Sequence, residues 1–185
     1  GFLTSGPDIA AALAAFRVGV PHLERVIGFG NCDGASALML TEGAGFEGLI
    51  LSNPWTIEND SEEAAAPPPA ALRSHYLRRL RDPGAILRLI AGKVSLRALA
   101  TSLLGALRPT PPPSTLAIRL AEGLTRFSGP VSILLASRDR TAQAFEAAWP
   151  KGDARVQSCE NATHSYVEPQ SEAWLEARLI DMLRG

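Results

Sequence analysis

The sequence predicts an α/β fold, in which helices flank a mostly parallel sheet and a helical insertion interrupts it. Short apolar runs that suit buried parallel strands alternate along the chain with helix-like segments. An interval rich in arginine and proline breaks this alternation near the middle. Of the 185 residues, 46% are hydrophobic and 20% are charged, so one domain with a packed core is expected.

The first part of the chain predicts one helix, then a strand, a helix and a strand. Residues 8–19 form the first helix, which Asp8 can cap. The apolar run 24–29 ends in a glycine and predicts a buried strand. A helix over 35–40 and a strand over 48–52 follow, and Asn53-Pro54-Trp55 closes the strand.

The middle of the chain predicts a helical cap insertion over 58–126, between core segments 1–57 and 127–185. Its start is acidic, with four acids in 58–63. Between Ala71 and Arg108 there are eight basic residues and one acidic residue. Ser114 can cap a last helix that ends near Arg126. We expect the insertion to lie over the carboxyl-terminal edge of the sheet.

Regular α/β order returns after the insertion. The apolar run 131–137 predicts the clearest strand in the chain, a helix follows over 141–149, and 154–159 is a weaker strand. A terminal helix is expected over 171–183. Its buried side should consist of four apolar residues: Trp174, Leu175, Leu179 and Met182.

The candidate nucleophile is Cys32, in the string Gly30-Asn31-Cys32-Asp33-Gly34 between a predicted strand and a predicted helix. This is the context of a nucleophile elbow. The glycines Gly30 and Gly34 allow a strained backbone and a close approach of strand and helix. The backbone N–H of Asp33 can face a developing oxyanion, and we expect the positive helix end to favour a thiolate at Cys32.

A base and an orienting acid follow in the order that this elbow requires. Asp139 comes directly after the strand at 131–137, and His164 comes directly after the strand at 154–159. Parallel sheets place their sites at the carboxyl ends of the strands, so the three side chains should meet there. The sequence therefore predicts a Cys32-His164-Asp139 triad.

Each of these residues also has an ordinary structural interpretation. Cys32 can be a small buried hydrophobe, although that leaves its flanking glycines unexplained. Asp139 can be a surface charge, and His164 can be a loop or capping histidine. Two other acids compete for the orienting role. Asp33 is too close in sequence to the nucleophile, and Asp153 precedes the last strand rather than following the strand at 131–137.

With the triad in place, the chain resembles the exosortase A system-associated hydrolases, which are bacterial α/β-hydrolases encoded beside exosortase and exopolysaccharide genes. The string Gly30 to Ser36, the stretch Leu51 to Trp55, and the surroundings of Asp139 and His164 carry the resemblance, which covers nearly the whole chain. More remotely, the elbow is similar to those of dienelactone hydrolases and polyhydroxyalkanoate synthases, which also use cysteine.

The leading functional prediction is cleavage of an ester or thioester through an acyl-enzyme on Cys32. The same triad serves an acyltransferase when an acceptor other than water takes the acyl group. A non-catalytic binding protein that keeps the fold is a further alternative, and membrane adsorption through 71–108 is a weaker one. The basic charge of 71–108 favours an anionic small-molecule or acyl substrate, but a solvated helix face explains it equally well.

Composition and histidine spacing exclude several other classes. The net charge of -1 argues against nucleic-acid binding. His22, His75 and His164 are far apart and no CxxC occurs, so we expect no metal and no cofactor.

We interpret Cys159 as a core residue, and His22 and His75 as surface residues. Without a signal peptide or an apolar span, we expect a cytoplasmic protein.

One helix precedes the elbow strand, whereas the resemblance implies several strands there. We therefore expect the early strands, and the loop that gives the second oxyanion N–H, to be absent from this chain. The chain also begins without methionine. The expectation is an N-terminally truncated piece of a protein longer by roughly 80–100 residues, with a processed chain as the other option. Such a piece should hold the triad but little activity.

Overall fold

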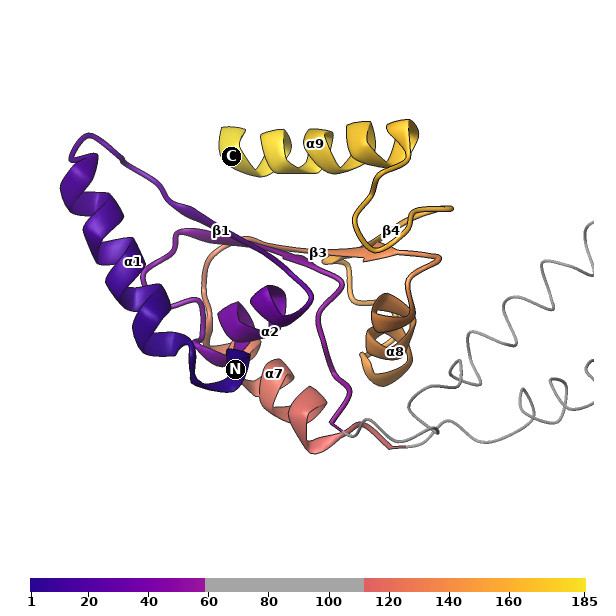
Figure 1. Ribbon diagram of the computed structural model, residues 1–185. Helices are drawn as coiled ribbons and strands as arrows, with labels where there is room; N and C mark the ends of the chain where they lie inside the picture. The colour runs from indigo at the N-terminus through magenta and orange to yellow at the C-terminus, as the bar shows by residue number, and fades with distance from the viewer. Residues whose placement is uncertain (59–111) are drawn as a thin grey trace, which may run out of the picture. The chain divides into compact units, whose positions relative to one another are not determined.

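A computed structural model of the protein describes residues 1–58 and 112–185 (Figure 1). Within them, a single sheet holds four strands in the order β1-β2-β3-β4, and every neighbouring pair is parallel. The predicted fold class, a parallel sheet flanked by helices, is thereby confirmed. The strands are β1 (Ile27–Asn31), β2 (Gly48–Ser52), β3 (Val131–Ala136) and β4 (Val156–Cys159).

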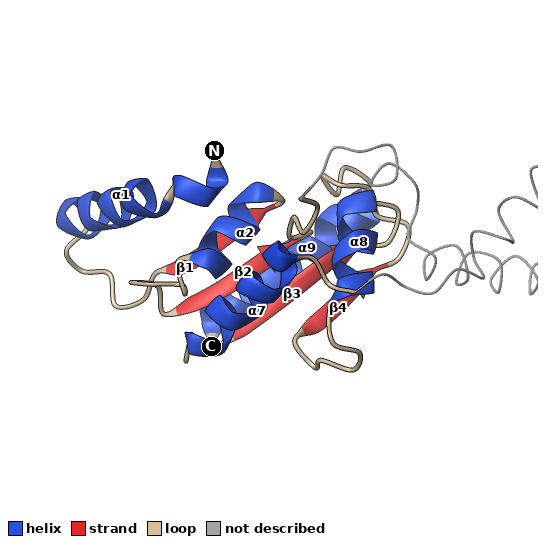
Figure 2. Ribbon diagram, turned by 90° about the horizontal axis from the view of Figure 1, so that it is seen from below, coloured by secondary structure: helices blue, strands red, loops and turns tan. Residues whose placement is uncertain are grey.

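Helices cover both faces of this sheet. Figure 1 shows α9 on one face and α2, α7 and α8 on the other, and Figure 2 views the sheet from the side of the latter three. None of the helices in the described ranges is long and apolar enough to cross a membrane. The helices are η1 (Phe2–Thr4), α1 (Gly6–Gly19), α2 (Asp33–Leu40), α7 (Thr115–Arg126), α8 (Arg140–Ala148) and α9 (Pro169–Arg184).

The core lies between the sheet and the three helices α2, α7 and α8. Side chains alternate between the two faces of a strand, so Leu49 and Leu51 of β2 point to the same side as Ile133 and Leu135 of β3. All four are buried, and they belong to one apolar cluster. The helices complete that cluster with Leu38, Met39, Leu116, Leu120, Leu124 and Phe145.

Helix α7 belongs to this core and packs against α2. Its buried residues Leu116, Leu120 and Leu124 recur every four positions, which places them on one face. Ser114 caps the helix, as predicted, because its side chain accepts a hydrogen bond from the backbone N–H of Ala117 at 3.1 Å. Apart from Glu58, residues 112–114 and α7, the predicted cap over 58–126 falls on 59–111, which lie outside the described residues.

Most predicted elements shift by one to three residues at an end in the structure, and two of these shifts are informative. Helix α1 begins at Gly6 rather than at Asp8, with Ser5 as its N-cap, because Pro7 fits the first turn of a helix. Asp8 therefore lies in the first turn and is not the cap. Strand β1 covers Ile27–Asn31 rather than 24–29, because its pairing with β2 begins at Ile27. This extension brings the end of β1 to the residue before Cys32.

Candidate active site

Cys32 occupies a strained turn between β1 and α2. Its backbone has φ 57° and ψ -118°, a conformation that residues with a side chain rarely adopt. The N–H of Cys32 donates to the carbonyl oxygen of Ser52 at 2.9 Å, so β2 holds the turn in place. Strain of this kind is concentrated at functional sites, where the surrounding structure maintains it.

The glycines of this turn differ in their steric role. A Cβ atom at Gly30 would lie 2.4 Å from the carbonyl carbon of Gly34 and 2.5 Å from the backbone nitrogen of Ala35. Only glycine therefore lets β1 pass this close to α2. A Cβ atom at Gly34 would meet nothing within 4 Å, so close packing explains Gly30 and not Gly34.

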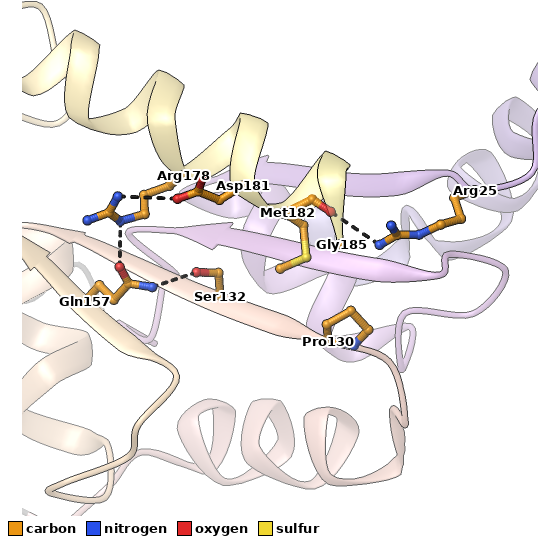
Figure 3. Close-up of a pocket in the computed structure, with 8 residues that line it drawn as sticks. All are labelled: Arg25, Pro130, Ser132, Gln157, Arg178, Asp181, Met182 and Gly185. Carbon is orange, nitrogen blue, oxygen red and sulfur yellow. Dashed lines mark hydrogen bonds and ion pairs between the residues drawn. The ribbon is translucent and has the colours of Figure 1, made fainter.

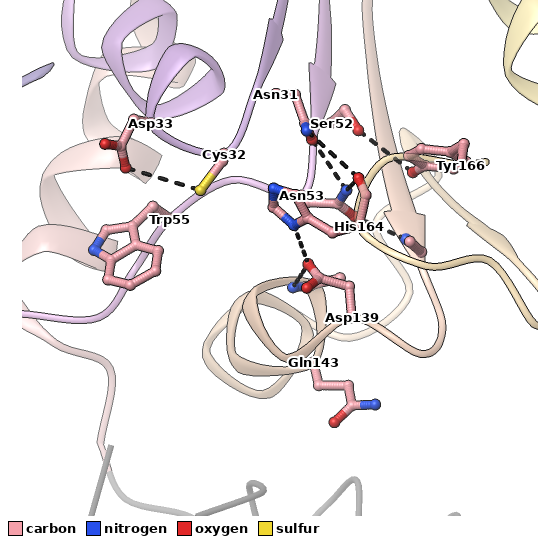
Figure 4. A network of polar contacts seen from close by, with 12 residues as sticks. Asn31, Cys32, Asp33, Ser52, Asn53, Trp55, Asp139, Gln143, His164 and Tyr166 are labelled. Atoms are coloured by element: carbon pink, nitrogen blue, oxygen red, sulfur yellow. Dashed lines mark hydrogen bonds and ion pairs between the residues drawn. The ribbon is translucent and has the colours of Figure 1, made fainter. Parts of the chain in front are cut away.

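The structure brings Asp139 and His164 together. Nδ1 of His164 lies 3.1 Å from Oδ2 of Asp139 (Figure 4). The Asp139 side chain is 10% exposed and that of His164 is 39% exposed, so the acid is sheltered and the imidazole is reachable. A carboxylate beside Nδ1 favours the neutral imidazole that carries its proton on Nδ1, which leaves Nε2 as the acceptor.

Cys32 lies at the same end of the sheet, on the side that Nε2 of His164 faces (Figure 4). Its Sγ contacts Oδ1 of Asp33, at 3.9 Å. Burial raises the pKa of Cys32 above its ordinary value, and the negative charges of Asp33 and Asp139 raise it further. The backbone N–H of Asp33 acts in the opposite direction but is outweighed. The helix end favours the thiolate as expected, but burial and the nearby carboxylates outweigh it, so the thiol needs a base.

The competing acids have other environments. Asp153 pairs with Arg155 at 2.7 Å and accepts a hydrogen bond from the indole of Trp149 at 2.9 Å. The hydrogen bonds from Arg155 hold the pKa of Asp153 well below its usual range. Asp33 lies beside the sulfur rather than beside His164 (Figure 4). Asp139 is therefore the carboxylate that contacts His164.

The remaining residues singled out in the sequence also have their places. Cys159 is a free cysteine, 6% exposed, in an apolar cluster with Ala136 and Tyr166, which confirms it as a core residue. His22 is exposed, as predicted, and His75 lies outside the described residues. Among the described residues, no three His, Cys, Asp or Glu side chains gather as a metal site would require.

Four polar residues that the prediction left out line the same end of the sheet: Asn31, Ser52, Asn53 and Tyr166 (Figure 4). Ser52 lies 3.4 Å from the hydroxyl of Tyr166, and burial raises the pKa of that hydroxyl to about 12. Tyr166 is consequently neutral and does not act as a base at ordinary pH. The available signal was that Asn31 and Asn53 each stand at the carboxyl end of an apolar strand.

A separate cavity of about 510 Å³ lies against α9, and its lining includes Arg25, Gln157 and Arg178 (Figure 3). Its polar groups bind one another. Nε of Arg178 donates to Gln157 at 2.7 Å, and the amide of Gln157 donates to Ser132 at 3.2 Å. We assign no ligand to this cavity because its hydrogen-bonding groups already have partners.

Comparison with known proteins gave matches among solved structures alone. No family model matches the chain, and neither does any curated protein. The chain is similar to a monoacylglycerol lipase from Paleococcus ferrophilus, with 17% identity and a TM-score of 0.49 over 97% of this chain and 74% of the lipase. It is also similar to BpoC of Mycobacterium tuberculosis H37Rv, named as a non-heme bromoperoxidase, with 16% identity and a TM-score of 0.46 over 100% and 73% of the two chains.

Proposed function

We propose that the protein is an α/β-hydrolase that cleaves an ester or thioester through an acyl-enzyme on Cys32. The contact between Nδ1 of His164 and Oδ2 of Asp139, 3.1 Å apart at the strand ends where Cys32 also lies, supports it most. It leaves Nε2 free to take a proton on the side of the thiol. This is the division of labour in a nucleophile-base-acid triad.

Acylation begins when Nε2 of His164 takes the proton of the Cys32 thiol. The sulfur then bonds to the carbonyl carbon of the substrate, and the carbonyl oxygen becomes an oxyanion. The backbone N–H of Asp33, the first residue of α2, is the donor that would stabilise this charge. When the tetrahedral intermediate collapses, the alcohol or thiol leaves with the proton held by His164.

Deacylation repeats the sequence with water. His164 takes a proton from water, hydroxide bonds to the acyl carbon, and the bond to Sγ breaks. The thiolate recovers its proton from His164, and the free acid leaves. The Asp139 carboxylate stabilises the imidazolium in both halves of the reaction. If another hydroxyl or thiol replaces water, the same steps transfer the acyl group.

The substrate class rests on the sequence. The resemblance to exosortase-associated hydrolases supports a role linked to exosortase and exopolysaccharide systems. The basic segment 71–108 supports an anionic substrate, such as an acyl-CoA or an acidic saccharide ester. A comparison of acetyl-CoA with p-nitrophenyl acetate tests the preference for an anionic substrate. We expect the KM to be lower for the CoA ester, and we expect that KM to rise when salt is added.

The deciding experiment is a search for the acyl-enzyme. The protein is incubated with p-nitrophenyl acetate for long enough to capture slow acylation, then quenched, digested and mapped by mass spectrometry. We expect one acetyl group on the Cys32 peptide, and we expect it to be missing in Cys32→Ala. Cys159→Ala, which removes the other thiol, is the matched control and should keep the acetyl group. Release of acid reports hydrolysis, and added glycerol or cysteamine reveals transfer. Turnover without an adduct in Cys32→Ala would overturn the cysteine mechanism.

A further inference from the structure

Asn53 lies directly after β2 with its side chain buried among the loops of the candidate site. It is 0% exposed, and its φ of 44° is in the left-handed region, which asparagine tolerates better than most residues. A buried amide is costly unless its donors and acceptor all find partners. The partners of Asn53 therefore indicate what the residue does.

The side chain makes three hydrogen bonds to three segments (Figure 4). Its Oδ1 accepts from the backbone N–H of Ala136 at 2.8 Å. Its Nδ2 donates to the backbone carbonyl of His164 at 3.1 Å and to Oδ1 of Asn31 at 3.0 Å. The amide of Asn31 lies 3.4 Å from the same His164 carbonyl, so two asparagines hold that oxygen.

Each partner adjoins one member of the proposed triad. Asn31 is the residue before Cys32. The carbonyl of Ala136 accepts a hydrogen bond from the backbone N–H of Asp139 at 2.9 Å. Ala136 therefore fixes the turn that carries the acid. The third partner is the main chain of His164 itself. One amide thus ties together the nucleophile turn, the acid turn and the histidine loop.

We propose that Asn53 is a positioning residue that holds the main chain of His164 where its imidazole can reach both Asp139 and Cys32. The proposal rests on the function proposed above. Asn53 touches no reacting atom, so it acts through the placement of His164. Misplacement by about 1 Å can slow a reaction by about 10²-fold, and the His164 side chain is 39% exposed, so the hold on its main chain matters.

The test uses Asn53→Gly, which removes the amide while keeping a residue that accepts a positive φ. The matched control is Asn161→Gly, because Asn161 is exposed and has a φ of 62°. Asn31→Ala removes only one of the two amides that hold the His164 carbonyl. It is the replacement test variant if Asn53→Gly does not fold. The first readout is the ¹⁵N NMR spectrum of the His164 ring without substrate, which reports the tautomer.

We expect the Nδ1–H tautomer in the wild type and in Asn161→Gly. In Asn53→Gly the tautomers should mix, with a smaller change of the same kind in Asn31→Ala. In acetyl ester turnover, kcat should fall by about 10²-fold with KM nearly unchanged.

An unchanged His164 spectrum in a folded Asn53→Gly or Asn31→Ala protein would refute the positioning role, even if stability falls. Absence of an adduct on wild-type Cys32 would refute the hydrolase proposal instead, and the ring spectra would still decide the role of Asn53.

Discussion

Oδ2 of Asp139 lies 3.1 Å from Nδ1 of His164 and accepts a hydrogen bond from the backbone N–H of Ala142 at 3.0 Å. The bond from Ala142 caps α8, whose N-cap residue is Asp139. The same carboxylate therefore starts a helix and orients the candidate base. These two roles respond differently to substitution, which allows them to be measured separately.

Asp139→Asn should lose acylation rate while keeping most of its stability. Asparagine caps helices as well as aspartate does, so its oxygen can still accept from Ala142. Its amide carries no charge to stabilise an imidazolium, and we expect acylation of Cys32 to slow by about 10²–10⁴-fold. Rapid-mixing kinetics with p-nitrophenyl acetate and urea unfolding measure the two effects.

Asp139→Ala supplies the contrast because it removes both roles. It should slow acylation at least as much and also reduce the free energy of unfolding by about 0.5–2 kcal/mol through loss of the cap. Equal losses of stability in the two variants would contradict the capping role. Normal acylation in either variant would show that Asp139 does not serve His164.

Asp33→Asn should make the thiol easier to ionise. Burial is the main cause of the raised pKa of Cys32, and the Asp33 charge adds to it, so removing that charge must lower the pKa. The rate of iodoacetamide alkylation at Cys32 should reach its half-maximum at a lower pH than in the wild type. Asp181→Asn is the control, since this carboxylate is 68% exposed on α9. A midpoint that stays in place or rises would show that Asp33 does not oppose ionisation.

Cys32 should react before Cys159 in the folded protein. Cys32 is half-buried at a loop, whereas Cys159 is 6% exposed inside an apolar cluster. Limiting iodoacetamide followed by peptide mapping should label the Cys32 peptide, and both peptides should label at similar rates in urea. Faster labelling of Cys159 without denaturant would reverse the assignment of the reactive thiol.

Chain order was enough to predict the strands and the contact between Asp139 and His164, because strand periodicity and the carboxyl-end rule are local and topological. Asp139 and His164 each follow an apolar strand, and parallel pairing then brings them to one edge. The role of Asn53 could not be read in this way. Its three partners come from segments that are distant in sequence and meet only after folding.

The ionisation of Cys32 shows a different limit. Its position before α2 is visible in the sequence, and the helix end alone favours a thiolate. Burial of the sulfur and the approach of the Asp139 charge depend on the packed structure, and they outweigh the backbone donor. The helix-end rule gives the right direction for its own contribution, but the net direction depends on opposing contributions that are tertiary.

Gly30→Ala and Gly34→Ala form a matched pair that tests the elbow. At Gly30 the new Cβ would lie 2.4 Å from the backbone of Gly34, and backbone cannot move aside as a flexible side chain can. Overpacking costs about 1–3 kcal/mol even among side chains, so Gly30→Ala should lose at least that much and misplace Cys32. At Gly34 the new Cβ meets nothing within 4 Å, and alanine favours the helix by up to about 1 kcal/mol. Urea unfolding and the rate of Cys32 alkylation measure both variants. If Gly34→Ala lost as much free energy of unfolding as Gly30→Ala, the turn would not be packed as described.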